Sequence, residues 1–502
     1  MLDQRGALTG HWKSALAYTA MLGGAVGAFF LICKQGALLT ALPPAAGAAA
    51  FASAATKSAG HPLLHVLIAL VAIIIAAGAV GAAFRYLGQP PVIGEVVAGI
   101  MLGPSLLGRI SPSTQEMLFP KDTAPLLGIL SQIGVVLFMF IVGVEFDTAA
   151  LKKRGHASVA ISHASIVTPF VLGGLLALVL YPQFSSSDVP FVHFALFMGV
   201  SMSITAFPVL ARILSDRKLQ RTKLGVLALT CAAVDDVTAW CLLALIVTIA
   251  RRSALSQAAL TFGFSGAFVL FMAYVGRPAL RWLGEQHEKS REGLSYKTMA
   301  IVLVGLLLSA ITTEAIGVHA LFGAFVFGAI IPSDSALAKD LETQVSGLVR
   351  VLFLPAFFAF TGLRTQIGLI DTPTQWLFCG GIIAVAVLGK FGGSFAAAAA
   401  TGLGWRDSAA IGALMNTRGL MELIVLNLGL DLNVISPTIY AMMVIMAIVT
   451  TFMTSPVLTM LQWTPQTQWG PQSQRGAALS QRGAALLSHA GHEQAEGLGS
   501  PE

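Results

Sequence analysis

Long apolar segments recur along most of this chain, and they constrain its fold more than any other feature of the sequence. A membrane-spanning helix needs about 20 mostly apolar residues, and the windows that meet this requirement are 15–33, 62–87, 91–108, 124–146, 157–181, 191–214, 222–250, 256–282, 296–314, 316–337, 346–368, 374–402, 406–430 and 435–462. They lack the short alternating segments that are typical of membrane β-barrels. We therefore predict an all-α, multi-pass integral membrane protein with about thirteen core helices and one extra N-terminal helix.

The overall composition agrees with this prediction. The chain is 56% hydrophobic and 11% charged, whereas about a quarter of the residues of a soluble domain are charged. We interpret the net charge of +6 as an excess of basic residues in membrane-flanking loops and not as a nucleic-acid surface. A G-x-x-x-x-G-K-[ST] motif is not found in the sequence, which disfavours a nucleotide-driven pump.

Basic residues collect in alternate loops between the predicted spans. One side of the membrane receives Lys152, Lys153 and Arg154, and then a second cluster between residues 212 and 223. The linkers 182–190 and 431–434, which face the other side, carry no basic residue. Because positive loops stay in the cytoplasm, this asymmetry predicts that both termini are cytoplasmic.

The two ends of the chain differ from its centre. Residues 1–60 hold one apolar stretch and an Ala/Pro-rich linker, and we predict a retained transmembrane helix, with a cleaved signal peptide as the alternative. Residues 61–463 form the predicted transmembrane domain. The polar segment 464–502 contains a short repeat, "SQRGAALSQRGAAL", and is predicted to be a disordered cytoplasmic tail.

Two adjacent carboxylates, Asp235 and Asp236, lie near the middle of one span, and Lys390 lies near the middle of another. Ionisable side chains at this depth are costly and are usually functional. Consecutive helical residues point about 100° apart, so one aspartate is able to pair with a lysine while the other faces a cavity. A buried Asp–Lys pair that only locks two helices is the simpler alternative, but it leaves the second carboxylate unpaired.

Two spans carry features that interrupt a helix. Pro208 lies inside one of them and deprives the Ile204 carbonyl of its helical partner. The other holds Asn416, Thr417, Arg418 and Gly419 in succession. Interrupted helices at corresponding positions of two halves indicate a transporter site, and these two correspond if the core consists of inverted repeats. We interpret Arg418 mainly as a neutraliser of Glu422.

Six motifs follow one another along the chain, namely "QPPVIGEVVAGIMLGPSLLG", "GVVLFMFIVGVEFD", "TAFPVLARIL", "AAVDDVTAW", "GVHALFGAFVFGAIIP" and "NTRGLMELIVLNLG". Together they resemble the monovalent cation:proton antiporter-2 family, which includes sodium/proton antiporters, potassium efflux systems and plant cation/proton exchangers. The resemblance covers about residues 62–462 and leaves out the N-terminal helix and the tail.

This resemblance implies a thirteen-helix core of two inverted repeats with broken crossing helices, usually in a homodimer. The family's dimer panel would correspond to residues 62–146 and 296–368, and its moving transport bundle to 157–250 and 374–462. Asp236 would bind the proton and the cation, Na⁺ or K⁺, and Asp235 would be the salt-bridge partner of Lys390. Thr205, with the breaks at 204–208 and 416–419, would form the crossing-helix site.

The predicted function is therefore secondary antiport of H⁺ against Na⁺ or K⁺ by alternating access, in a bacterial inner membrane. We expect no enzymatic activity, no cofactor and no nucleic-acid partner. A proton-uncoupled cation channel or a sensor on the same scaffold is the alternative, and it differs in passing cations without proton coupling. The choice between Na⁺ and K⁺ stays open, because carboxylate sites bind both.

Overall fold

The computed structural model describes residues 2–43, 62–120, 123–145, 156–219, 222–250, 255–290 and 293–461. Within these ranges the chain is helical, and the only β pairing is one isolated bridge between Leu42 and Ser186. The predicted tail at 464–502 and most of the predicted Ala/Pro-rich linker lie outside the described residues. The all-α prediction is confirmed for the part of the chain that is described.

The first half of the chain contains these helices: α1 (Leu2–Gly36), α2 (Pro62–Tyr86), α3 (Pro91–Leu102), α4 (Leu107–Ile110), α5 (Pro112–Leu118), α6 (Thr123–Glu145), α8 (His156–Phe184), α9 (Phe191–Ser203), α10 (Phe207–Asp216) and α11 (Lys223–Ala250). The second half contains α12 (Leu255–Phe271), α13 (Arg277–Ser290), α14 (Tyr296–Ile316), α15 (Ala320–Ala329), α16 (Ala336–Leu348), α17 (Leu354–Arg364), α18 (Pro373–Val387), α19 (Gly393–Ala400), α20 (Trp405–Met415), α21 (Leu420–Asp431) and α22 (Pro437–Met460). Single π-helical turns join α12 to α13, α16 to α17 and α18 to α19, namely η2 (Met272–Gly276), η3 (Val349–Phe353) and η5 (Leu388–Gly392). A short 3₁₀ turn, η4 (Ile367–Leu369), follows α17.

Ten helices of the described residues are long and apolar enough to cross a membrane, or eleven if the bent pair α20 and α21 counts as one span. The multi-pass membrane prediction is confirmed, while the count of thirteen core helices stays a prediction. The predicted span 316–337 differs from the structure, because α15 covers only Ala320–Ala329. Ser335 caps the next helix by accepting a hydrogen bond from the Ala338 amide, and α16, η3 and α17 then follow one another without a loop.

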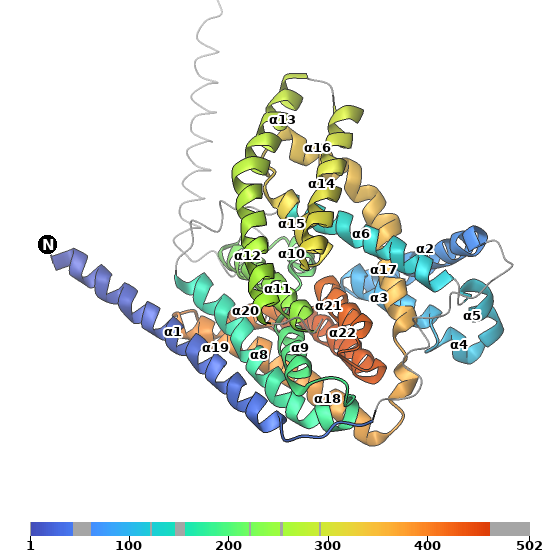
Figure 1. The fold of residues 1–502 in the computed structure, drawn as a ribbon, viewed down its shortest axis with the longest axis horizontal. Coiled ribbons are helices and arrows are strands. Elements are labelled where there is room, and N and C mark those ends of the chain that lie inside the picture. The colour runs from blue at the N-terminus through green and yellow to red at the C-terminus, as the bar shows by residue number, and fades with distance from the viewer. Residues whose placement is uncertain are drawn as a thin grey trace, which may run out of the picture.

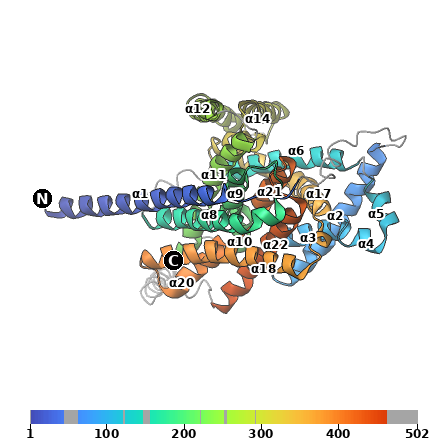
Figure 2. The same ribbon diagram turned by 60° about the horizontal axis from the view of Figure 1, so that its bottom comes forward.

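The helices pack in two groups (Figure 1). In one, α6 lies against α15 and α17, and α3 lies against α2 and α17. In the other, α8 packs on α9, α11 and α19, while α22 packs on α18, α20 and α21. The view turned by 60° shows α12 and α14 apart from the second group, where α8 and α18 lie (Figure 2). The division of the core into a panel and a transport bundle stays a prediction.

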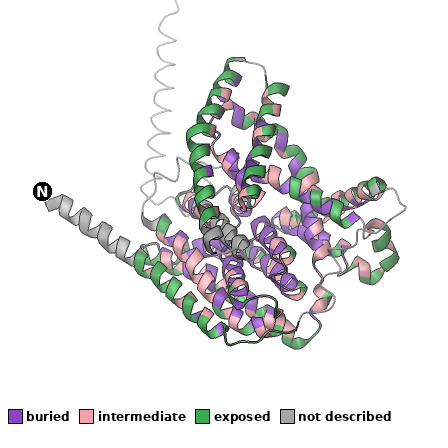
Figure 3. Cartoon of the chain, viewed as in Figure 1, coloured by how far each residue is buried: buried purple, intermediate pink, exposed green. Residues whose placement is uncertain are grey.

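Glycines allow a very close contact between α6 and α15 of the first group. A Cβ on Gly143 of α6 would lie 2.3 Å from the Phe325 carbonyl oxygen of α15, and a Cβ on Gly328 of α15 would lie 2.2 Å from the Phe140 carbonyl oxygen of α6. Only residues without side chains allow two backbones to come this near, which is a common means of packing in membranes. The buried residues accordingly concentrate where helices meet, while outward faces stay exposed (Figure 3).

The N-terminal helix α1 packs along α8 and α9 (Figures 1 and 2). Phe29 of α1 meets Phe170 of α8 with ring centroids 5.2 Å apart. The opposite face of α1 is apolar and open, with Phe30 75% and Leu31 67% exposed. Such a face is suited to lipid, which agrees with the predicted N-terminal membrane helix.

Candidate functional site

The two interrupted helices meet at their breaks. The first runs from α9 through the non-helical residues 204–206 into α10, and the second runs from α20 through 416–419 into α21 with a bend of 42°. The Ala206 amide of the first break donates to the Thr417 carbonyl of the second over 3.0 Å. Ile204 lies in the first break, and Pro208 follows it in the first turn of α10, where proline is tolerated. The side chain of Pro208 lies outside the described residues.

Arg418 joins the second break to the end of α9. Its guanidinium donates to the carbonyls of Ser201 and Met202 over 2.8 and 2.6 Å, and to Glu422 Oε2 over 2.7 Å. Arg418 and Glu422 are fully buried. The last carbonyls of a helix have no intrahelical donor and carry partial negative charge, which the arginine offsets, while Glu422 lies in the first turn of α21, at its positive end.

The backbone of the second break is held by a threonine of α22. The Thr451 hydroxyl accepts from the Arg418 amide over 2.9 Å and lies 2.6 Å from the Arg418 carbonyl oxygen, to which it is able to donate. Gly419 faces Val209 and Ala206 of the other interrupted helix, so that a Cβ there would lie 2.6 Å from a Val209 methyl. The two breaks therefore form one cross-linked unit and not two independent kinks.

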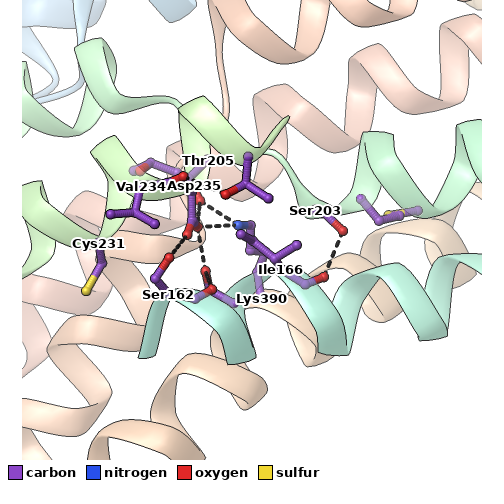
Figure 4. Close-up of polar contacts among 12 residues, drawn as sticks. Ser162, Ile166, Ser203, Thr205, Cys231, Val234, Asp235 and Lys390 are labelled. Carbon is purple, nitrogen blue, oxygen red and sulfur yellow. Dashed lines mark hydrogen bonds and ion pairs between the residues drawn. The ribbon is translucent and has the colours of Figure 1, made fainter. Parts of the chain in front are cut away.

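Asp235 of α11 is fully buried beside this unit and receives hydrogen bonds from three other segments (Figure 4). Its Oδ1 accepts from the Ser162 hydroxyl over 2.7 Å. Its Oδ2 accepts from the hydroxyls of Ser165 and Thr205 over 2.5 and 2.7 Å, and from Lys390 Nζ over 3.1 Å. A buried carboxylate is stable only when its charge and its lone pairs are matched in this way.

Lys390 reaches Asp235 from η5, the π-helical turn between α18 and α19, and it is also fully buried. Its ammonium donates to Thr205 Oγ1 over 2.5 Å as well as to Asp235. Glycines on both sides bring this turn against α8: a Cβ on Gly389 would lie 2.8 Å from Pro169, and one on Gly393 would lie 2.8 Å from the Thr168 hydroxyl. Single π turns inside helices occur often at functional sites.

Asp236 is the next residue of α11 after Asp235. Its side chain lies outside the described residues, as do those of several neighbours in the second half of α11. The prediction that Asp236 binds a proton and a cation therefore stays a prediction.

Ser162 and Ser165 are site residues that the sequence analysis missed. They are spaced i, i+3 on α8, so both hydroxyls lie on one helix face. Ser158, one turn earlier on the same face, offers its carbonyl to the Cys231 thiol of α11 over 3.4 Å. A stripe of hydroxyl residues within an otherwise apolar span is the signal that could have identified them.

The chemistry of this cluster suits a proton or a small cation. Carboxylate and hydroxyl oxygens are the ligands that hard cations prefer, and helix breaks add free backbone carbonyls. Protonation of a carboxylate removes it as a cation ligand, so the two bound species compete. The cluster has the oxygens needed to hold a monovalent cation as cargo.

Comparison with known proteins places these residues in a family. Residues 66–463 match the profile of the family described as sodium/hydrogen exchanger, transmembrane. The Na⁺/H⁺ antiporter NhaS4 of Synechocystis sp. is 43% identical over 406 residues, which are 81% of this chain and 99% of that protein.

Eukaryotic relatives are longer. The K⁺/H⁺ antiporter 1 of Saccharomyces cerevisiae is 32% identical over 85% of this chain, and the Cation/H⁺ antiporter 20 of Arabidopsis thaliana is 38% identical over 79% of it. The chain spans 50% and 48% of the length of these two proteins.

A solved structure has the same fold. The sodium proton antiporter MjNhaP1 from Methanocaldococcus jannaschii, determined at pH 8, superimposes with a TM-score of 0.55 over 80% of this chain and 97% of its own, at 17% sequence identity. Fold, profile and relatives agree with the resemblance that the motifs carry. The chain belongs to the sodium/hydrogen exchanger transmembrane family.

Proposed function

We propose that this protein is a secondary antiporter that exchanges H⁺ for Na⁺ or K⁺ across the membrane. The observation that carries the proposal is the meeting of two helix breaks beside a buried Asp235–Lys390 pair. The names of the relatives support it, since they are Na⁺/H⁺, K⁺/H⁺ and cation/H⁺ antiporters. A proton-uncoupled channel or a sensor has no such support.

Asp236 is proposed as the group that takes up either the proton or the cation. A single carboxylate that binds one or the other couples their movements without ATP, because each ligand displaces the other. Thr205 and the backbone at residues 204 and 416–419 complete the proposed site with oxygen ligands. Arg418 has a structural role in this proposal, since its guanidinium already donates hydrogen bonds to Glu422 and to two carbonyls of α9.

Asp235 and Lys390 are proposed as the charge pair that accompanies exchange. In the described arrangement Lys390 neutralises Asp235. Arrival of a cation next to Asp235 supplies a second positive charge, which lowers the attraction between this carboxylate and the lysine. The ion pair then opens during the cycle, and Lys390 moves away from Asp235.

Alternating access is proposed to occur by movement of one helix group against the other. The transport bundle, residues 157–250 and 374–462, would move against a panel formed by residues 62–146 and 296–368, and the panel would also form a homodimer. We propose a bacterial inner membrane with both termini in the cytoplasm, and no enzymatic activity, cofactor or nucleic-acid partner.

Reconstituted transport tests the proposal. The purified protein is placed in liposomes that contain a pH-sensitive dye, and Na⁺, K⁺ and Li⁺ are added in turn. We expect at least one of the cations to drive protons across the membrane in the opposite direction. Cation flux that proceeds without any proton movement would contradict the antiporter and favour the channel.

A further inference from the structure

Two serines of α8, Ser162 and Ser165, donate hydrogen bonds to Asp235, and the proposed exchange gives them no role. The Ser162 hydroxyl is the single hydrogen-bond donor to Asp235 Oδ1 within the described residues. Ser165 donates to Oδ2 over 2.5 Å. Both serines are fully buried, so no bulk water is available to replace either hydroxyl.

The packing of α8 on α11 fixes these donors in place. Ser158 meets Cys231, and four residues later on each helix Ser162 meets Asp235, so the two contacts share one register along the interface. Gly389 and Gly393 hold the helix segment that bears Lys390 against Pro169 and Thr168 of α8, one to two turns along from the two serines. The serine hydroxyls and the lysine ammonium therefore approach the same carboxylate from two neighbouring helix segments.

The serine hydroxyls and Lys390 differ in what they supply. Lys390 brings a positive charge on a long, flexible stem with rotatable bonds. The serine hydroxyls bring neutral donors on short stems fixed to a helix, and they remain where they are when the lysine moves. Ser165 Oγ also lies 2.8 Å from the Ser162 carbonyl oxygen, but its single proton serves one acceptor at a time, and Asp235 Oδ2 is the nearer and the charged acceptor.

An anion that loses its partner inside a membrane is costly unless other donors remain. Without the lysine, Asp235 still has the hydroxyls of Ser162, Ser165 and Thr205. Thr205 is itself an acceptor from Lys390 and belongs to the first broken helix. The two serines are thus the donors to Asp235 that come from outside the crossing unit and are independent of Lys390.

We propose that Ser162 and Ser165 are positioning residues that hold Asp235 as an oriented anion while Lys390 is released. This inference rests on the proposed exchange, in which the Asp235–Lys390 pair opens during the cycle. Without the two hydroxyls the open state of the ion pair loses its stabilisation, so that cation binding has to supply more of the free energy that opens the pair. The concentration of cation needed for half-maximal exchange therefore rises, whereas the maximal rate changes little, because the step that follows cation binding is unchanged.

The test uses isosteric variants of the full chain in liposomes. The S162A/S165A variant removes both hydroxyls, and S162C/S165C fills their space with somewhat larger thiols that are only weak donors. Ser131→Ala is the matched control, since Ser131 is a buried serine of α6 that donates to the Leu127 carbonyl of its own helix and, within the described ranges, to no other group. The KM for the cation and kcat are measured for each variant.

We expect the KM of S162A/S165A to rise about tenfold or more, with kcat changed less than about threefold, because hydrogen bonds to a charged group are among the strongest. S162C/S165C should match S162A/S165A, and Ser131→Ala should match the wild type. A serine-to-cysteine variant that behaves like the wild type would show that the serines act through packing, and an unchanged KM in S162A/S165A would also overturn the proposal.

A stability measurement separates this inference from the proposed function. The serine substitutions are combined with K390M, and the melting temperature of each variant is measured in detergent. The loss on removing both serines should be larger in the K390M background, because Asp235 then keeps only Thr205. Equal losses in both backgrounds would overturn the inference even if the wild type transports normally. Absence of exchange in the wild type would instead refute the proposed function, on which the inference rests, whatever the melting temperatures are.

Discussion

The buried pair of Asp235 and Lys390 makes a quantitative prediction about stability. Lys390→Met removes the ammonium but keeps most of the volume of the side chain, so little new space is created. Breaking a fully buried pair by removing one partner costs about 3–5 kcal/mol, since the other charge remains in a low dielectric. Three hydroxyl donors stay on Asp235 in this variant, so we expect the lower end, about 3 kcal/mol.

The double variant D235N/K390M removes both charges at once. No unpaired ion is then left behind, and replacement of a buried pair by neutral groups is often close to neutral in stability. We therefore expect the double variant to be more stable than K390M alone by about 2 kcal/mol or more. Two substitutions with independent effects would instead add, which would make the double variant the least stable of the set.

Thermal unfolding in detergent reads out this difference. For a chain of this size a change of 1 kcal/mol corresponds to roughly 1–2 °C in melting temperature, by extension of the size scaling for smaller domains. K390M should melt several degrees below the wild type, and D235N/K390M should lie between them. If the double variant melts at or below the temperature of K390M, the energetic coupling inferred from the 3.1 Å contact is refuted.

Three further variants test other parts of the structure. Gly328→Ala places a Cβ 2.2 Å from the Phe140 carbonyl oxygen and forces α15 away from α6. We therefore expect poor membrane insertion or a clearly lower melting temperature. Gly380→Ala is the control and should match the wild type, because a Cβ there would have no atom within 4 Å. Arg418→Met leaves Glu422 buried and unpaired, and it should cost about 3–5 kcal/mol of unfolding free energy; the added change Glu422→Gln should restore part of it in thermal unfolding. Thr205→Val removes the hydroxyl that contacts both Lys390 and Asp235. It should slow exchange in liposomes about ten- to a hundredfold. Thr205→Ser keeps a hydroxyl and should retain most of the rate.

Charge made the central part of the site predictable from the sequence. Asp235 and Lys390 are separated by 155 residues, but each is an ionisable group within an apolar helix, and such groups need partners. The breaks were equally visible, because Pro208 and the run Asn416–Gly419 do not suit a helix interior. The roles of these residues in transport stay predictions.

Neutral and backbone contributions were beyond the reach of the sequence. Ser162 and Ser165 carry no charge, and serine in a membrane helix usually bonds to its own backbone, as Ser131 does. The partners of Arg418 include carbonyls of Ser201 and Met202, more than 200 residues earlier in the chain, and every residue has a carbonyl. The π turn that presents Lys390 packs closely on α8 at Gly389, as does the start of α19 at Gly393, and the turn has no sequence signature of its own.

The most direct test of the proposed function is proton movement by the variant Asp236→Asn. Asparagine keeps the shape of the side chain and an oxygen ligand, but it can neither bind nor release a proton at physiological pH. We expect the variant to insert into the membrane and to melt near the wild-type temperature, with no cation-dependent proton movement in liposomes. Exchange at the wild-type rate by Asp236→Asn would contradict the assignment of Asp236 as the shared site of the proton and the cation.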